Sequence, residues 1–411
     1  MLPPLLRENA NFRRYFIGQA VSLLGDQITL IALPLTAVLA LHASAGKMGA
    51  LTTVALVPNL LFSLHAGVFV DRRGERRGVM LAADAGRGIL LLSVPVAYAL
   101  GDLTWAHLYV VAFGTGAFSV LFSVAYGGFF QTIVRREDYV TANSLAHGTR
   151  AFAYLAGTSL GGILVQLLRG PYALVVDGLS FFWSAGCLAR IDAPDPPRAA
   201  EAGEGLLDGA RWLRRNEVMR SELLGVATIN LFNFMFFALV LLYATRSLHV
   251  SPATLGLVLG SASVGTLLGS FVTARVSVRI GVGPTLILGC FLFTAPLVLV
   301  PAAGGPHWLV LLLLFVSEFV SGLGVMLLDI MAGAMSAAIV PPALRSRVSG
   351  AWTLVNYGVR PVGTTLAGVL GTVLGVRPTL WIATVGAVAG VLWLLPSPIA
   401  ALRELPEEAP A

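Results

Sequence analysis

Two long apolar runs are separated by the stretch Gly67-Val68-Phe69-Val70-Asp71-Arg72-Arg73-Gly74-Glu75-Arg76-Arg77. Glycine permits a tight turn there, and the four arginines of this stretch lie between two segments long enough to cross a membrane. Arginine is enriched in loops that stay in the cytoplasm. The stretch therefore predicts a cytoplasmic loop between two spans, either as an orientation signal alone or as a hinge that gates the molecule.

The composition is that of a protein with many membrane spans. Hydrophobic residues make up 56% of the 411-residue chain and charged residues 12%, with a mean hydropathy of +0.82. Soluble domains carry about 25% charged residues. The net charge of +6 does not indicate nucleic-acid binding, because the arginines are spread over loops between apolar runs. No cofactor is expected, and Cys187 and Cys290 lie inside apolar runs, where neither a disulfide nor a metal site is predicted.

A helix that crosses a bilayer needs roughly 20 apolar residues. The sequence predicts twelve such spans, at residues 15–40, 48–70, 79–100, 106–130, 142–168, 172–189, 220–245, 253–275, 283–303, 307–332, 347–373 and 377–396. We therefore expect an all-α integral membrane protein with six-helix bundles in residues 1–189 and 220–396. A linker at 190–219 joins them, and a cytoplasmic tail follows at 397–411.

The linker begins with prolines and then predicts an amphipathic surface helix. Leu206, Leu207, Ala210 and Leu213 fall on one face of this helix, with arginines on another. Trp212 is expected to anchor it at the membrane interface.

Basic residues predict the orientation. With the N-terminus inside, nearly all loop arginines lie on the cytoplasmic side, and the opposite side holds only Lys47, Arg169, Arg246 and Arg377. This asymmetry predicts a protein of the cytoplasmic membrane with both termini in the cytoplasm.

The two halves of the chain repeat. Leu41-His42-Ala43-Ser44 recurs as Leu248-His249-Val250-Ser251, 207 positions later. Further along, the offset becomes 206, and Gly157-Thr158 recurs as Gly363-Thr364. One register over many positions indicates two six-span halves of the same orientation, related by an axis along the membrane normal. Such repeats place the substrate site near the midplane, between the halves.

These features together resemble the major facilitator superfamily. Its signature after the second span is matched at every defined position by Gly67, Asp71, Arg72, Gly74, Arg76 and Arg77. The resemblance covers nearly the whole chain and implies two bundles that rock about a central cavity. It also implies that Asp71 faces the start of span 11, where a carboxylate could bond a helix end and latch the cytoplasmic side shut. The repeat replaces Asp71 with Val278, so orientation alone does not require this carboxylate.

Residues 135–162, Asp177 and segment 205–215 are similar to the branch of multidrug, macrolide and siderophore exporters, which includes drug:proton antiporters. Two features of proton antiporters are missing. Their Gly-Pro-x-x-Gly-Gly run has no proline here, and span 4 has no arginine. Gly157, Gly161 and Gly162 of that run are expected to let helices pack closely. Arg150 is a candidate for the role of the missing arginine.

Ionisable residues inside a bilayer are costly and are therefore candidate functional groups. Asp26 lies near the middle of span 1, and its repeat counterpart Asn233 cannot exchange a proton. We expect Asp26 to be the main proton-coupling residue; the alternative is a structural carboxyl paired with an arginine. Glu318 of span 10 is a second candidate for proton coupling or substrate binding, again with structural pairing as the alternative.

Two deep arginines, Arg150 in span 5 and Arg360 in span 11, each need an anionic, carbonyl or water partner. Asp26 and Glu318 are available. One arginine is expected to pair with an ionised acid and to release it on protonation or substrate binding; a static ion pair is the alternative.

The remaining charged residues in spans are predicted to pair near helix ends. Asp84 and Arg87 are three positions apart and can pair on one helical face. Asp177 and Asp329 are expected to be helix-end pairing groups.

Aromatic and amide side chains predict a cavity for bulky amphipathic ligands. Its expected lining is Phe122, Tyr126, Tyr154, Asn230, Asn233, Phe234, Phe237, Asn356 and Tyr357. For any single phenylalanine, core packing or lipid contact is the alternative. The chain lacks the dense polar set that a sugar requires, and it has no nucleophile elbow or phosphate loop, so an enzyme is not expected.

The sequence thus predicts a secondary transporter that exports small amphipathic or hydrophobic compounds by alternating access, driven by proton entry. The expected partners are a small-molecule substrate, protons and membrane lipid, but no nucleic acid, and a monomer is expected. Export of one metabolite such as a siderophore, flipping of a lysolipid, and a non-transporting sensor or scaffold are the alternatives. The direction of transport rests on the resemblance.

Overall fold

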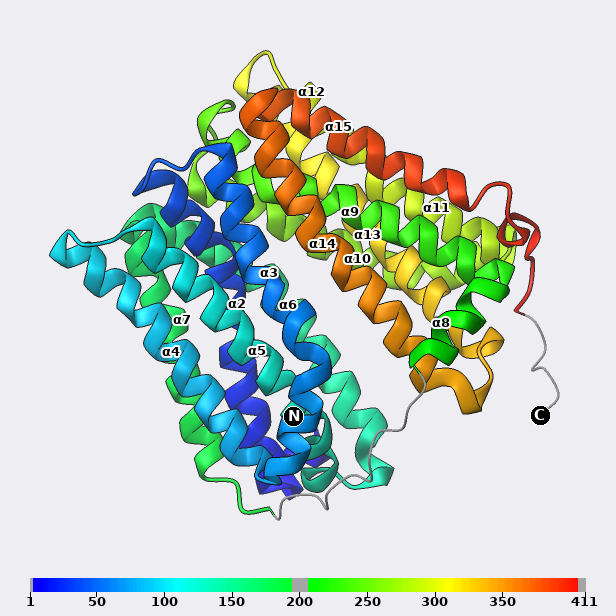
Figure 1. Ribbon diagram of the computed structural model, residues 1–411, viewed down its shortest axis with the longest axis horizontal. Coiled ribbons are helices and arrows are strands. Elements are labelled where there is room, and N and C mark those ends of the chain that lie inside the picture. Colours follow the sequence, from blue (N-terminus) through cyan, green and yellow to red (C-terminus); the bar gives the residue numbers. More distant parts are fainter. Residues whose placement is uncertain (1–2, 194–205, 406–411) are drawn as a thin grey trace. The chain divides into compact units, whose positions relative to one another are not determined.

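The computed structural model describes residues 3–193 and 206–405, without the side chains of residues 63–68, 71–73 and 206–207. Every element in this part of the chain is a helix (Figure 1). The bilayer interior offers no water to backbone N–H and C=O groups, so a spanning segment must satisfy them internally, as a helix does.

The elements follow one another with short connections. The N-terminal half forms α1 (Pro4–Glu8), α2 (Ala10–Leu39), α3 (Ala45–Arg73), α4 (Arg76–Leu100), α5 (Trp105–Ile133), the 3-10 turn η1 (Arg136–Asp138), α6 (Tyr139–Leu168) and α7 (Gly170–Ala189). The C-terminal half forms α8 (Leu206–Arg215), α9 (Glu217–Arg246), α10 (Pro252–Ile280), α11 (Val282–Thr294), η2 (Ala295–Val298), α12 (Leu299–Ala302), α13 (His307–Ile339), η3 (Pro342–Leu344), α14 (Arg345–Val373), α15 (Val376–Ala389), η4 (Gly390–Trp393) and η5 (Pro398–Ala401).

Eleven of the described segments are long and apolar enough to cross a membrane, and one of them, Val282–Ala302, joins α11, η2 and α12. The helix α14 has 29 residues, but its charged and polar side chains lower its mean hydropathy. With α14 included, the described residues contain twelve elements of membrane length, so the predicted all-α, twelve-span fold is confirmed. Helices extend past the predicted spans, because hydropathy detects only the apolar part of each helix: α13 has 33 residues.

The helix boundaries recur at the offset of the sequence repeat. The helices α2 and α9 begin at residues 10 and 217 and end at residues 39 and 246, an offset of 207 at both ends. Their caps repeat too. The side chain of Asn9 accepts a hydrogen bond from Phe12 N at 2.9 Å, and that of Asn216 accepts one from Met219 N at 3.0 Å. Asparagine satisfies an otherwise unpaired N–H group at each helix start.

Rare backbone conformations also recur in both halves. His42 and His249 have positive φ angles of 49° and 54°, 207 positions apart. Gly74 and Gly281 end α3 and α10 with φ angles of 72° and 98° at the same offset. Left-handed residues other than glycine are uncommon, so their repetition shows that the two halves share backbone geometry as well as sequence.

The helices form two compact units. The first unit contains the N-terminal half except Ser44–Thr53, together with Ser251–Gly260 of α10. The second unit contains the C-terminal half except that segment, together with Ser44–Thr53 at the start of α3. The helices α3 and α10 therefore each begin in one unit and continue in the other, which a division into sequence halves does not predict.

Close glycine contacts hold the first turns of α3 and α10 against their neighbouring helices. A Cβ added at Gly49 of α3 would lie 2.5 Å from Gly368 Cα on α14. A Cβ added at Gly256 of α10 would lie 2.9 Å from Gly162 Cα on α6. The two contacts correspond under the repeat. Lipid tails are as apolar as leucine, so close van der Waals packing of small residues is a main source of helix association in membranes.

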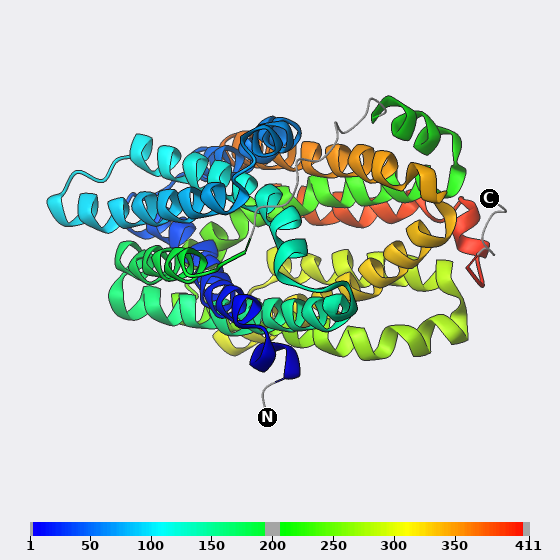
Figure 2. The same ribbon diagram turned by 90° about the horizontal axis from the view of Figure 1, so that it is seen from below.

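The linker helix α8 packs against the start of α14 within the second unit (Figures 1 and 2). Gly209 lies against the backbone of Arg347, and Asp208 pairs with Arg347 at 3.5 Å. Trp212, expected at the membrane interface, is half-buried and packs on a buried cluster that includes Leu213 and Val348. Hydrophobic periodicity identifies an apolar helix face but does not say whether lipid or protein covers it.

We expect Gly49→Ala to lower the thermal unfolding midpoint of the purified protein in detergent, because its Cβ would overpack α3 against α14 at a cost of about 1–3 kcal/mol. Gly256→Ala should act likewise at the equivalent contact. Gly127→Ala is the matched control: Gly127 lies on α5 with open space around it, and alanine favours helix there by up to about 1 kcal/mol. A wild-type midpoint for Gly49→Ala would contradict the packing role.

Candidate functional site

An ion pair lies inside the first unit, on α4. Arg87 donates to the carboxylate of Asp84, and the two residues have exposures of 5% and 0%. The rings of Phe181 and Phe122 lie 4.1 Å and 4.8 Å from the guanidinium carbon of Arg87. The pairing predicted from the three-residue spacing is therefore confirmed. A cation between aromatic faces gains electrostatic stabilisation that partly replaces lost water.

A second carboxyl, Asp177 of α7, is fully buried where α7 packs against α2. It accepts hydrogen bonds from Thr29 Oγ1 at 2.5 Å and Ser180 Oγ at 2.9 Å. Gly25 of α2 lies against the same carboxylate, where any Cβ would collide with it. The expectation that Asp177 pairs at a helix end is wrong. Its partners are hydroxyls, one of them on a facing helix, and such a contact leaves no mark in the sequence around Asp177.

Asp26 of α2 lies half-buried beside these groups. The charges of Arg87 and Asp84 act on Asp26, and the charge of Asp26 acts on Asp177. We call Asp26, Asp84, Arg87 and Asp177 the carboxylate cluster. It combines three acids with one guanidinium, so its net charge would be −2 if every member were ionised (one positive and three negative charges). The arginine that acts on Asp26 is thus Arg87, and neither Arg150 nor Arg360.

Hydroxyl and amide groups extend the cluster. Ser184 of α7 lies near Asp84, and Gln19 Nε2 of α2 donates to Ser184 Oγ at 3.2 Å. In the described part of the chain, Asp84 Oδ2 and Arg87 Nε are buried without a hydrogen-bond partner. Buried polar atoms are usually satisfied, so this cluster retains unused hydrogen-bonding capacity.

The second unit places its ionisable groups differently. Glu318 is half-buried on α13 and forms no ion pair among the described residues. Glu222 of α9 is buried at 1% exposure, and its Oε2 has no partner in that part of the chain. Glu222 was missed from the sequence because it follows the predicted start of span 7, next to basic residues. The helices α14 and α15 pack against α9, and the charge of Glu222 acts on Cys290 of α11.

Arg360 of α14 lies among aromatic rings. Its guanidinium carbon is 4.1 Å from the centroid of the Tyr357 ring and 4.7 Å from that of Phe234 on α9. Beside it, Asn230 Nδ2 donates to Asn356 Oδ1 at 2.8 Å. We call Arg360, Tyr357 and Phe234 the arginine cage. The expected partnership of Arg360 with an acid is absent from the described residues, and Arg150 is exposed on α6 without an ion pair there.

The residues expected to line the cavity fall into two groups. Phe122 is buried against Arg87, and Tyr126 stacks on Tyr15 with ring centroids 5.4 Å apart, so both pack inside the first unit. The others are exposed or half-buried apart from Asn356, which is buried at 5% exposure: Tyr154, Asn230, Asn233, Phe234, Phe237 and Tyr357.

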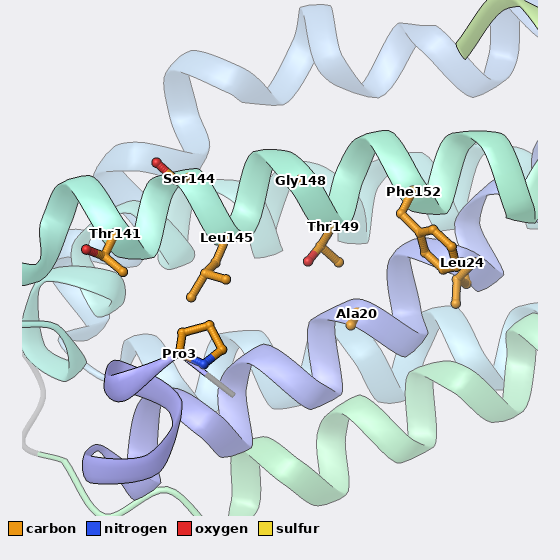
Figure 3. Close-up of a pocket in the computed structure, with 9 residues that line it drawn as sticks. All are labelled: Pro3, Ala20, Leu24, Thr141, Ser144, Leu145, Gly148, Thr149 and Phe152. Carbon is orange, nitrogen blue, oxygen red and sulfur yellow. The ribbon is translucent and has the colours of Figure 1, made fainter. Parts of the chain in front are cut away.

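A groove of about 530 Å³ opens in the first unit between α2 and α6 (Figure 3). Leu24, Leu145 and Phe152 give it an apolar surface. The remaining lining residues are Pro3, Ala20, Thr141, Ser144, Gly148 and Thr149. Ligand pockets of this kind measure about 300–1,000 Å³ and combine an apolar lining with a few polar groups. The groove was not predicted, because its residues come from three separate segments.

The glycines of α6 pack beside this groove. Gly157 lies against Leu24 and Gln27 of α2, and Gly161 lies against Ile28. Without side chains at these two positions, α6 can approach α2 closely.

The stretch from Gly67 to Arg77, which is predicted to act as a gate, belongs only in part to the described residues. The side chains of Gly67, Asp71 and Arg72 lie outside the described residues. Arg77 Nε donates to Leu188 O at 3.1 Å, and its Nη2 donates to Ala189 O. Carbonyls at a helix C-terminus lack partners within the helix, so Arg77 ties the start of α4 to the end of α7.

The sequence matches one known protein family over almost its whole length. A family model described as the Major Facilitator Superfamily matches residues 15–224 and 223–410. The chain belongs to this superfamily. It is a multi-pass membrane protein of a transporter family, as the signature between spans 2 and 3 suggested.

Its relatives include exporters. The enterobactin exporter EntS of Citrobacter koseri is 24% identical over 379 residues, which cover 90% of this chain and 87% of that protein. The multidrug efflux pump Tap of Mycolicibacterium fortuitum is 27% identical over 367 residues, covering 86% of this chain and 88% of Tap.

Solved structures share the fold. The nucleoside transporter NupG matches with a TM-score of 0.73 and 13% identity, over 94% of this chain and 98% of NupG. A bacterial homologue of the iron transporter ferroportin matches with a TM-score of 0.72 and 14% identity, over 96% of this chain and 99% of that one. At these identities the likeness concerns the fold alone.

The buried pair can be tested by a double-mutant cycle. We expect Arg87→Gln and Asp84→Asn each to lower the free energy of unfolding by about 3–5 kcal/mol, because each removes one partner of a buried ion pair. The double variant should lose less than the sum of the two single losses. Denaturant unfolding in detergent micelles measures all three. Additive losses would show that the two side chains do not stabilise each other.

Proposed function

We propose that the protein is a proton-coupled exporter of small amphipathic compounds in the cytoplasmic membrane, with both termini in the cytoplasm. The observation that carries the proposal is the carboxylate cluster, with three acids near one guanidinium. Like charges close together oppose one another's ionisation. A proton therefore reduces the cost of holding this cluster within a membrane protein, and the cluster can exchange that proton as the protein changes state.

Asp26 is the member best placed to exchange the proton. Asp84 is paired with Arg87, and Asp177 accepts two hydrogen bonds from hydroxyls. Both are fully buried, whereas Asp26 is half-buried and belongs to no ion pair among the described residues. Protonation of Asp26 removes its attraction to Arg87, which lies on a different helix, and so changes how strongly α2 and α4 are held together.

In this proposal Glu318, Arg150 and Arg360 modulate the proton exchange at Asp26. Glu318 is half-buried in the second unit and has no ion pair among the described residues. A carboxyl in that setting can also take up a proton. It provides a second protonation site, which would make coupling sensitive to the state of both units.

The proposed substrate class rests on the groove and on the relatives. The groove between α2 and α6 combines apolar side chains with threonine and serine hydroxyls. Such a lining suits molecules with an apolar body and few polar groups. EntS is named as an enterobactin exporter and Tap as a multidrug efflux pump, so broad export and export of one metabolite both have precedents among relatives.

A transport assay tests the coupling. In proteoliposomes with an imposed pH gradient, wild type should accumulate an amphipathic probe chosen from cations, macrolides, catecholates and lysolipids. Asp26→Asn should lose gradient-driven accumulation by tenfold or more but keep exchange without a gradient, because the amide cannot carry a proton. Asp102→Asn, which removes an exposed carboxyl between α4 and α5, is the matched control. Gradient-driven transport by Asp26→Asn at the wild-type rate would exclude Asp26 as the coupling residue.

We also propose that Asp71 latches the cytoplasmic side by bonding a helix end. Asp71→Asn should then raise the cytoplasmic accessibility of a cysteine placed at Thr149 in the groove, because loss of the charge weakens the latch. The rate of labelling by a membrane-impermeant maleimide in inside-out vesicles measures this. Glu75→Gln, in the same turn, is the control. Equal labelling rates in Asp71→Asn and wild type would refute the latch.

A further inference from the structure

The arginine cage of the second unit holds a positive charge that its surroundings do not balance. Arg360 touches the rings of Tyr357 and Phe234, and its buried Nε has no hydrogen-bond partner in the described part of the chain. No carboxylate there acts on Arg360, and Tyr357 is the titratable side chain that does. Aromatic rings offset part of the cost of burying a cation, but they do not replace a counter-charge.

Glu318, which the sequence offered as a partner for Arg360, does not supply that counter-charge. Glu318 lies in the same unit on α13, yet Arg360 does not act on it. The two opposite charges of this unit are therefore held apart. A structural ion pair, which the sequence allowed for Arg360, is not formed among the described residues.

Lipid headgroups cannot supply the charge either. Arg360 lies 15 residues after the start of α14 and 13 residues before its end (360 − 345 and 373 − 360). At about 1.5 Å per residue, the two ends of the helix are about 22 Å and 20 Å away. An arginine can extend its side chain toward the interface from near a helix end, but not from the middle of a helix of this length.

The cage is open enough to receive a ligand. Arg360 is half-buried, and Tyr357 is 39% exposed. The amide pair of Asn230 and Asn356 borders it, since Asn356 lies one turn before Arg360 on the same helix. A guanidinium binds carboxylates and similar anions through two parallel N–H donors. The cage therefore joins a guanidinium that has no ion pair among the described residues to aromatic surface.

We propose that the arginine cage is a binding site for the acidic group of an amphipathic anion, with Tyr357 and Phe234 contacting its aromatic or apolar body. The proposal rests on the export function above and narrows its substrate class to molecules that carry a carboxylate, sulfonate or similar anionic group. The repeat does not duplicate the cage: position 360 corresponds to Tyr154 in the first half (360 − 206). Recognition of the anion therefore belongs to the second unit.

Three probes with one aromatic body test the charge preference: 1-naphthoate, 1-naphthamide and 1-naphthylmethylammonium. Calorimetry on wild-type protein in lipid nanodiscs at neutral pH should give a dissociation constant about ten- to a hundredfold lower for naphthoate than for naphthamide, as one charge-assisted hydrogen-bonded contact provides. The ammonium should bind most weakly. No binding of naphthoate, equal affinities, or a preference for the ammonium would overturn the proposal.

Variants assign the preference to Arg360. Arg360→Gln should bind naphthoate and naphthamide equally, whereas Arg279→Gln, which removes an exposed arginine at the end of α10, should keep the wild-type preference. Retained preference in Arg360→Gln would overturn the proposal. Unchanged naphthamide affinity shows that this variant is folded. If Arg360→Gln does not fold, Arg360→Lys replaces it as the test. Lysine keeps the charge without the planar pair of donors, so the preference for naphthoate over naphthamide must fall severalfold. An unchanged preference would overturn the proposal.

Measuring both binding and transport distinguishes the anion site from the export function. Charge-dependent binding through Arg360 without any transport under a pH gradient would refute export and leave the anion site standing. Gradient-driven transport of amphipathic probes, with binding that ignores their charge, would refute the anion site and leave export standing.

Discussion

A charge inside a membrane protein is tolerated only where something compensates it, because burial removes the water that would otherwise stabilise it. Two sites, one in each unit, depart from that balance in opposite senses. In the first, Arg87 pairs with Asp84 and also acts on Asp26 and Asp177, so three acids share one guanidinium. In the second, Arg360 is surrounded by rings and the positive charge has no acid beside it. The first unit is suited to take up a cation and the second to take up an anion.

The repeat explains how one fold carries two such sites. Helix boundaries, asparagine caps and left-handed residues recur in both halves. The glycine contacts Gly49–Gly368 and Gly256–Gly162 also correspond. Side chains at equivalent helix positions differ: Asn233 corresponds to Asp26, and Arg360 corresponds to Tyr154. The shared scaffold thus supplies equivalent positions, and substitutions at those positions give each unit its own charge.

The sequence was sufficient for features that depend on spacing along one helix. Span number, the repeat offsets and the Asp84–Arg87 pair are of this kind, since each can be read from periodicity. The sequence was insufficient where a partner comes from another helix. It could not show that Thr29 bonds Asp177, or that Trp212 packs on a cluster that includes Val348 of α14. Arg360 was singled out by its predicted depth, but its aromatic partner Phe234 lies 126 positions away (360 − 234) on α9.

An anionic substrate would also change the energetics of the proposed exchange. Moving one elementary charge across a membrane is worth about 2.3 kcal/mol per 100 mV. If a proton enters while a cation leaves, no net charge crosses, and the inside-negative potential contributes nothing. If a proton enters while an anion leaves, two charges move in the favourable sense, worth about 4.6 kcal/mol per 100 mV. The opposite charge imbalances of the two units would thus let the membrane potential drive export together with the pH gradient, so an exporter built this way would keep working when the pH difference alone is small.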